Sequence, residues 1–184
     1  MRPRPKCRDP EHRVWRFEAK GQTYRFAKAS DELCRTADRW TERLVDWSWL
    51  TLYQQRETCL YALVTDEGAP LALFAMKPAP LNLAAGKTTR LDFFEVAPIA
   101  RGGGLPNAAF SLFARLCFDF GCTTLAVQSL REPRVLDFYK DLGAKPGALK
   151  GWSAAKGLVA IGFTHDTLEM LKERADAFQE KDDA

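Results

Sequence analysis

The sequence predicts a single domain of mixed α/β class. The chain of 184 residues is close to the usual size of one domain, and its 46% hydrophobic and 28% charged residues are typical of soluble globular proteins. Short apolar runs of strand type alternate with segments of helical periodicity, and no internal repeat or low-complexity segment interrupts them. The longest apolar runs fall well short of the roughly 20 residues that cross a bilayer, so we expect no membrane association.

The first half of the chain predicts two hairpins separated by helical segments. Alternating residues on either side of Lys20-Gly21 predict the first hairpin, and Asp66-Glu67-Gly68 supplies the turn of the second. Ser30 caps a helix whose apolar positions continue at helical spacing as far as Trp47. Residues 47–53 extend the aromatic content into a second helix or a loop.

The second half predicts strands and helices in alternation. Residues 77–87, with two prolines and a glycine, predict a loop that leads into this half. Apolar residues recur every four positions after Gly104, and Gly121 ends that helix. The expected strands are 91–96, 124–130 and 157–163, and the expected helices are 105–120, 133–142 and 164–179.

The N-terminal segment 1–13 carries five basic side chains against two acidic ones, and prolines interrupt any helix there. We expect a flexible basic arm, followed by one domain over residues 14–184. A net charge of +3 is too small to predict a nucleic-acid-binding surface, so we expect a solvated arm and no nucleic acid among the partners. Recruitment of an acidic target such as a tRNA by this arm is the alternative.

The cysteines are odd in number and form no CxxC pair; they are Cys7, Cys34, Cys59, Cys117 and Cys122. This pattern indicates neither a disulfide framework nor a zinc site, so we expect no metal and a reducing, cytoplasmic location. Cys117 falls on the apolar stripe of the helix 105–120, where a cysteine is usually a small core residue.

The most informative segment is the glycine-rich turn between the strand 91–96 and the following helix. Pro98 ends the strand, and Gly102, Gly103 and Gly104 stand directly before the helix. Glycine admits positive φ and lets a ligand approach without meeting a Cβ, while the first helical turn offers unpaired N–H groups. Such donors, with the fixed charge of Arg101, suit a pyrophosphate. The turn fits neither the P-loop nor the GxGxxG fingerprint, and a plain tight connection is the alternative.

This turn resembles the acyl-CoA-binding motif of the GNAT N-acyltransferase superfamily, Val-x-Pro-x-x-Arg-Gly-x-Gly-Leu/Ile-Gly/Ala. The residues that fit in register are Val96, Pro98, Arg101, Gly102, Gly104 and Leu105, and Pro106 is the mismatch. A second stretch resembles the closing motif of the family, Phe-Tyr-x-x-Leu-Gly-Phe. It matches at Phe138, Tyr139, Leu142 and Gly143, with Ala144 in place of the last Phe and Glu132 where many members carry an Asn.

The resemblance implies the GNAT fold, a single mixed and mostly antiparallel central sheet flanked by helices. It also implies an N-acetyltransferase that uses acetyl-CoA, without a metal, to acetylate an amine of a small molecule, a peptide N-terminus or a lysine. The implied cofactor-binding residues are Val96, Arg101, Gly102, Gly103, Gly104, Leu105, Pro106 and Asn107. Pro106 removes one N–H donor that a Gly or Ala would offer, and Asn107 is the expected substitute.

The candidate catalytic residues are Tyr139 and Glu95. Tyr139 matches the position that often protonates the coenzyme A thiolate in the family. Strand alternation sends Asp92 and Glu95 to opposite faces, so only one of them is expected to point at the amine as the general base. We favour Glu95, with a chain of water molecules as the alternative.

Two further questions stay open at this stage. In the resembled family the connection between the first two helices forms one wall of the acceptor site, which makes Trp47, Trp49 and Tyr53 candidate contacts, although aromatic clusters are more often core. The alternative function is a catalytically degenerate GNAT-fold protein that acts as an acyl-CoA-binding or partner-binding module. Many family members form homodimers, so a second copy of the chain is a candidate partner.

Overall fold

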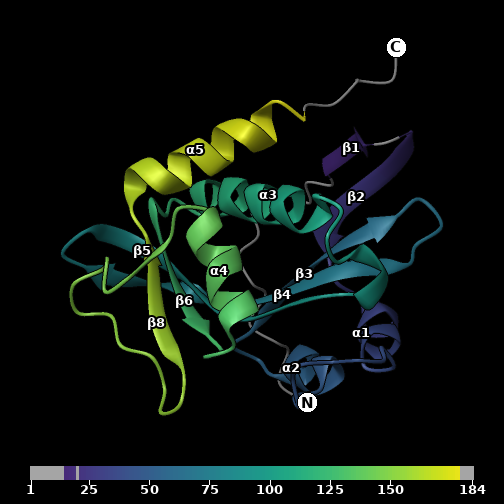
Figure 1. The fold of residues 1–184 in the computed structure, drawn as a ribbon, viewed down its shortest axis with the longest axis horizontal. Coiled ribbons are helices and arrows are strands. Elements are labelled where there is room, and N and C mark those ends of the chain that lie inside the picture. The colour runs from purple at the N-terminus through teal and green to yellow at the C-terminus, as the bar shows by residue number, and fades with distance from the viewer. Residues whose placement is uncertain (1–14, 20, 179–184) are drawn as a thin grey trace.

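The computed structural model describes residues 15–19 and 21–178, so the basic arm 1–13 lies outside the described residues. Its framework is one eight-stranded sheet in the order β1-β2-β3-β4-β5-β6-β8-β7, with helices on both faces (Figure 1). The strands are β1 Trp15–Ala19, β2 Gln22–Lys28, β3 Cys59–Thr65, β4 Pro70–Leu83, β5 Gly86–Val96, β6 Thr124–Ser129, β7 Lys145–Pro146 and β8 Val159–Phe163. The helices are α1 Asp31–Ala37, α2 Trp49–Gln54, α3 Leu105–Asp119, α4 Pro133–Asp141 and α5 His165–Asp176, with a short 3-10 helix, η1, at Pro98–Ala100. The predicted mixed, mostly antiparallel sheet flanked by helices is confirmed.

The sheet separates two hydrophobic cores. Helices α3 and α5 pack on one face and α1 and α2 on the other (Figure 1). Side chains of β3 and β4 alternate between the two cores, as the period of two in a strand requires. Those under α3 and α5 are Tyr61, Leu63, Phe74 and Met76, and those under α1 and α2 are Leu60, Ala62, Leu73 and Ala75.

Among the strands that the structure describes, β5 and β6 form the one parallel pair, and they pair for only part of their length. Their register runs over four positions, from Thr88↔Thr124 to Leu91↔Val127. Beyond that point β5 continues to Val96 and β6 to Ser129 without further pairing to each other. Backbone N–H and C=O groups on the facing edges of these strand ends therefore have no neighbouring strand to bond. An extended ligand can bond them instead.

A β-bulge in β5 changes which side chains face the helices. Ala75 pairs with Phe93 and Met76 with Leu91, so Asp92 is the extra residue of β5. The bulge resets the alternation, because Leu91 and Phe94 both pack into the core under α3. The carboxylate of Asp92 then lies on the same face of the sheet as that of Glu95, toward α1 and α2. The prediction that these two residues face opposite sides is wrong for this reason.

The first helix is shorter than its apolar spacing predicts. It ends at Ala37 rather than near Trp47, and Leu44, a predicted apolar-face residue, is 58% exposed. The reason is Asp38, whose carboxylate accepts hydrogen bonds from the Ser48 hydroxyl and from the backbone N–H of the first two residues of α2. This contact reverses the chain and makes residues 39–47 a loop. The second helix, one of two alternatives for 47–53, is present as α2.

The predicted loop 77–87 is instead the far end of a long hairpin. β4 continues to Leu83 and β5 starts at Gly86, and a register shift between Lys77 and Leu81 accommodates the interruption. Proline in this stretch therefore marks an irregular part of the ladder rather than its end.

The cysteines depart from expectation at one position. Cys34, Cys117 and Cys122 are buried free thiols, as a core role predicts, and burial raises the pKa of the Cys34 thiol to about 12. Cys59 is disulfide-bonded, so the expectation of no disulfide is wrong there. The cytoplasmic location inferred from the cysteines stays a prediction. Across the described residues, none of the helices combines the length and the apolar character of a membrane span.

Two helices end in the same glycine motif, which permits a matched test of packing. Gly121 after α3 and Gly143 after α4 both have positive φ, 74° and 95°, and close Schellman motifs. A Cβ on Gly121 would meet nothing within 4 Å, whereas one on Gly143 would lie 2.7 Å from Cγ2 of Thr167.

We expect Gly121→Ala to lower the free energy of unfolding by about 1 kcal/mol, the cost of a left-handed residue. Gly143→Ala should cost clearly more, because Thr167 must move as well. Urea denaturation of both variants measures the difference. Equal losses would show that α5 accommodates the methyl group and that Gly143 is required only for its backbone conformation.

Candidate functional site

The glycine-rich turn, residues 101–104, is shaped to leave open space before α3. Gly102 and Gly104 have φ of 84° and 81°, and a Cβ on either would meet no atom within 4 Å. Gly104 is the N-cap of α3 and Pro106 is the second residue of the helix. Proline fits there because its missing N–H breaks no helical hydrogen bond.

The turn and the first residues of α3 present a row of backbone donors. The first intrahelical donor of α3 is Ala108, which bonds the Gly104 carbonyl at 3.1 Å. Within the described part of the chain, the N–H groups of five residues before it have no backbone partner: Gly102, Gly103, Gly104, Leu105 and Asn107. Donors of this kind at the positive end of a 15-residue helix form a favourable environment for an anion.

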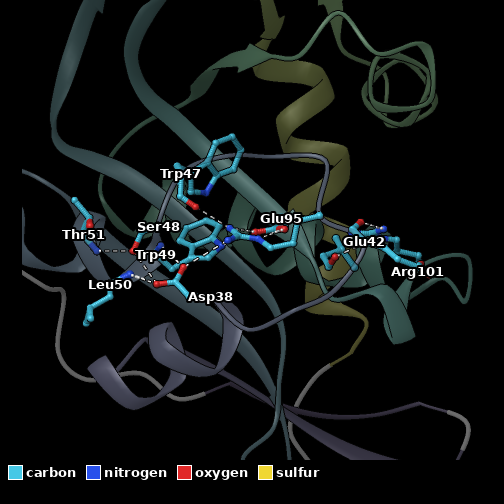
Figure 2. A network of polar contacts seen from close by, with 11 residues as sticks. Asp38, Glu42, Trp47, Ser48, Trp49, Leu50, Thr51, Glu95 and Arg101 are labelled. Carbon is cyan, nitrogen blue, oxygen red and sulfur yellow. Dashed lines mark hydrogen bonds and ion pairs between the residues drawn. The ribbon is translucent and has the colours of Figure 1, made fainter.

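Arg101 is turned back from this row toward two carbonyl groups. Its Nε donates to the Val96 carbonyl at 3.2 Å and its Nη1 to the Glu42 carbonyl at 3.1 Å (Figure 2). A guanidinium has five N–H donors, so three of them have no partner among the described residues. Arg101 thus combines an exposed charge beside the turn with a link to the loop between α1 and α2.

Glu95 lies buried at the other side of that loop, surrounded by donors. Arg43 binds it with two parallel hydrogen bonds, Nε to Oε1 and Nη2 to Oε2, both 2.9 Å long. The indole Nε1 of Trp49 donates to Oε2 at 2.6 Å (Figure 2). These contacts supply what a buried carboxylate needs, and the hydrogen bonds to Glu95 raise the pKa of Arg43.

Asp92 is engaged in a similar way where β5 and β6 cease to pair. Its carboxylate forms an ion pair with Arg90 at 2.8 Å and accepts a hydrogen bond from Gln128 Nε2 at 3.1 Å. Gln128 in turn accepts from the backbone N–H of Ala155 through its Oε1 at 2.9 Å. Both carboxylates of β5 therefore carry an arginine partner, and neither is an isolated base.

Tyr139 lies on α4 with its ring in the core under α3. It contacts the rings of Phe110, Phe138 and Phe163 edge-on and is 3% exposed. Burial raises the pKa of its phenol well above the ordinary value, because the apolar surroundings disfavour the phenolate. Its hydroxyl has no hydrogen bond to another described residue, so it remains available as a donor.

The aromatic residues of the predicted acceptor wall differ in burial and in their polar contacts. Trp49 is fully buried and serves as a donor to Glu95, which fits the core alternative. Trp47 is half-buried, with its ring 4.8 Å from that of Phe93, and its indole Nε1 is buried without a partner in the described structure. Tyr53 is half-buried against the core of α1 and α2.

Sequence reasoning missed the basic partners of the site, Arg43 and Arg90. The signal for them was present, since two carboxylates in an apolar strand require compensating donors. It does not say which arginine supplies them. Among the described residues, no three His, Cys, Asp or Glu side chains gather in a group able to hold a metal ion.

Comparison with solved structures identifies the fold. No protein-family model matches the chain, nor does any curated protein. It superposes with a TM-score of 0.56 on a GNAT-family acetyltransferase from Listeria monocytogenes, at 14% identity, over 80% of this chain and 98% of that one. The chain has the GNAT fold.

Other structures with the GNAT fold are equally distant in sequence. A mutant of the toxin AtaT, bound to the C-terminus of the antitoxin AtaR and acetyl-CoA, has a TM-score of 0.55 at 17% identity, over 80% of this chain and 97% of that one. A chimera of the spermidine N-acetyltransferase SpeG from Vibrio cholerae with hSSAT has a TM-score of 0.60 at 8% identity, over 79% and 98%. At such low identity, these superpositions establish the fold of the chain and do not establish its reaction.

The pair of Arg43 and Glu95 provides a test of the site's construction. Arg43→Met leaves a buried carboxylate with the Trp49 indole as its sole remaining donor of the three, so we expect the free energy of unfolding to fall by about 3 kcal/mol. In the double variant, with Glu95→Gln added, the neutral amide still accepts from Trp49 and part of the loss should be recovered. Chemical denaturation followed by tryptophan fluorescence measures both. A loss below about 0.5 kcal/mol in the single variant would show a solvent-screened pair instead.

Proposed function

We propose that this protein is an N-acetyltransferase that transfers an acetyl group from acetyl-CoA to an amine. The observation that carries the proposal is the row of five N–H groups without a backbone partner in the described residues, on the glycine-rich turn and the first turn of α3, in a chain with the GNAT fold. The AtaT neighbour is bound to acetyl-CoA, which supports the choice of cofactor. The acceptor class stays as predicted: a small-molecule amine, a peptide N-terminus or a lysine.

The proposed path of the cofactor follows from the turn and the parting strands. A pyrophosphate on the N–H groups of the turn would leave the pantetheine arm to run back along the unpaired edge of β5. The arm has about as many backbone atoms as four residues of extended chain, so its thioester would lie near Asp92 and Phe93. Main-chain groups of the facing strand ends would bind its amides as a third strand would.

The proposed chemistry needs little beyond orientation and one proton donor. The amine nitrogen attacks the thioester carbonyl, the tetrahedral intermediate collapses, and the C–S bond breaks to give an amide and a thiolate. Tyr139 would donate the proton that the thiolate takes up. Because burial raises its pKa, the phenol is fully protonated at neutral pH and ready to do so.

For the role of general base, the geometry favours a chain of water molecules over Glu95. Glu95, the residue favoured from sequence, already accepts three hydrogen bonds, two of them from a cation. Both of its carboxylate oxygens are therefore already bonded to protein donors and face Arg43 and Trp49 rather than an incoming amine. We therefore propose that the amine proton leaves through water and that Glu95 organises the acceptor side.

A catalytically degenerate module is the second candidate, favoured by Pro106. This residue removes one N–H from the row of donors, and Arg101 already spends two of its donors on protein carbonyl groups. Binding and turnover together distinguish the two candidates, since the degenerate module either binds acyl-CoA without turnover or does not bind it.

Isothermal titration with acetyl-CoA tests the binding step. We expect micromolar affinity for the wild type and a dissociation constant at least tenfold higher for Gly104→Ala, which strains the turn and places a methyl group before the donors. Gly68→Ala is the matched control, because Gly68 has a similar φ of 87° and equally open surroundings in the distant β3–β4 turn. Equal affinity of both variants would remove the turn as the pyrophosphate site, and no binding to the wild type would overturn the proposed function.

The role of Tyr139 is tested by Tyr139→Phe in a turnover assay that detects free thiol. With an amine that supports turnover, chosen from a panel of diamines, amino sugars and peptides, we expect kcat to fall about 100-fold while acetyl-CoA affinity is retained. The raised pKa also predicts that ionisation of Tyr139 causes no loss of kcat in the wild type below pH 10. An unchanged kcat would assign Tyr139 to the core alone.

A further inference from the structure

Two basic side chains lie next to each other on the α1 and α2 face of the sheet. Lys77 on β4 pairs directly with Arg90 on β5, and the neighbouring pair along the strands is Met76 with Leu91. Met76 and Leu91 pack into the core under α3, so the alternation of the strands turns Lys77 and Arg90 to the opposite face. Like charges directly opposite each other in an antiparallel pair repel, so this position favours a bound anion.

The carboxylate of Asp92 neutralises only part of this charge. Arg90 Nε lies 2.8 Å from Asp92 Oδ1, and Arg90 Nη2 donates to Oδ2 at 3.1 Å. Lys77 donates to the neutral hydroxyl of Thr58 at 3.3 Å and forms no ion pair with another described residue. The side chain of Arg90 is 30% exposed, and its Nη1 makes no hydrogen bond within the described part of the chain. One positive charge is therefore left over beside a side chain that solvent reaches.

The carboxylate oxygens on this side of the sheet are already occupied, whereas some of the donors are not. Both oxygens of Glu95 and both oxygens of Asp92 accept hydrogen bonds from protein side chains. In contrast, Arg90 Nη1 and the buried indole Nε1 of Trp47 have no hydrogen-bond partner among the described residues. Trp47 packs on Phe93, the residue after Asp92, so both donors lie near the proposed thioester position. A ligand there meets unpaired donors, which suit a group that accepts hydrogen bonds.

We propose that the amine acceptor carries a carboxylate, which Arg90 binds through Nη1 on the α1 and α2 face of the sheet. The acceptor is then a small amino acid rather than a diamine or an amino sugar. The guanidinium already contacts Asp92, so a carboxylate bound to it leaves the amine of the same molecule beside Asp92 and Phe93, where the thioester is proposed. Lys77, directly opposite Arg90, attracts the same anion without having to contact it. This inference rests on the proposed function.

The reaction with such an acceptor balances without a further reactant. The deprotonated amine nitrogen attacks the thioester carbonyl, the C–N bond forms and the C–S bond breaks. The nitrogen loses one proton to water, the thiolate takes up one from Tyr139, and Tyr139 regains its proton from water. The products are an N-acetylamino acid and free coenzyme A. The carboxylate is unchanged, and its contact with Arg90 holds the amine in place, so its loss should raise KM more than it lowers kcat.

Turnover of acids and of their amides tests the assignment. The panel contains amino acids, the corresponding carboxamides and 1,4-diaminobutane, and release of free thiol is the readout. In the wild type we expect kcat/KM for the best acid to exceed that for its carboxamide by about tenfold or more. Arg90→Gln should bring this ratio near one, chiefly through KM for the acid, and Arg90→Lys should restore part of it. The ratio is taken within one variant, so a general loss of activity from disturbing Asp92 cancels.

Arg35→Gln is the matched control, because Arg35 is exposed on α1 and its ion pair is with Asp31 one turn away; it should keep the wild-type ratio. Lys77→Gln should lower the ratio less than Arg90→Gln does. An unchanged ratio in Arg90→Gln would overturn the inference, as would a wild type that acetylates a carboxamide or 1,4-diaminobutane as well as the acids.

Titration of the same acids into protein saturated with coenzyme A measures binding without chemistry. Acids that bind the wild type no more tightly than their carboxamides do, or that bind Arg90→Gln with unchanged affinity, would overturn the inference whatever the turnover. Failure of the proposed function is seen separately, as no binding of acetyl-CoA or no turnover with any amine of the panel.

Discussion

The burial of the Glu95 carboxylate is the constraint on which the acceptor side of the molecule depends. An unpaired charge under α2 would be costly, and the chain supplies Arg43 and the Trp49 indole as its partners. Because Arg43 belongs to a loop without regular structure, this ion pair also determines where the loop lies. The position of the loop is thus set by electrostatics at the sheet rather than by the helical propensity of its own sequence.

A second constraint acts through β5 itself. The bulge at Asp92 turns the carboxylates at positions 92 and 95 to one face of the sheet, and the parting of β5 from β6 begins at the same place. Gln128 spans the parted strands by bonding Asp92 on one side and the Ala155 backbone on the other. The bulge, the unpaired strand edge and the polar groups beside it therefore occur at the same point of β5.

The sequence predicts the elements with strong local signals. The glycine-rich turn, the helix from Leu105 and the glycine that ends it, Gly121, all follow from backbone rules that involve few neighbouring residues. The end of α1 could not be predicted, because Asp38 ends it through contacts with residues 10 to 12 positions later. The same holds for the bulge, which appears only when β4 and β5 are aligned. Pairing of Arg43 with Glu95 spans 52 positions and leaves no local trace.

The effect of Pro106 on cofactor affinity follows from the energy of the one hydrogen bond that it removes. One hydrogen bond to a charged phosphate is worth about 1.5 to 3 kcal/mol, so the missing N–H weakens binding by one to two powers of ten. Five donors of the turn remain, and proline holds the φ that the first helical turn requires. The loss is therefore smaller than the total available from the turn, and it is of a size that the exposed charge of Arg101 can offset. On this balance Pro106 lowers affinity without removing the site, which is why the active enzyme rather than the degenerate module is the function proposed.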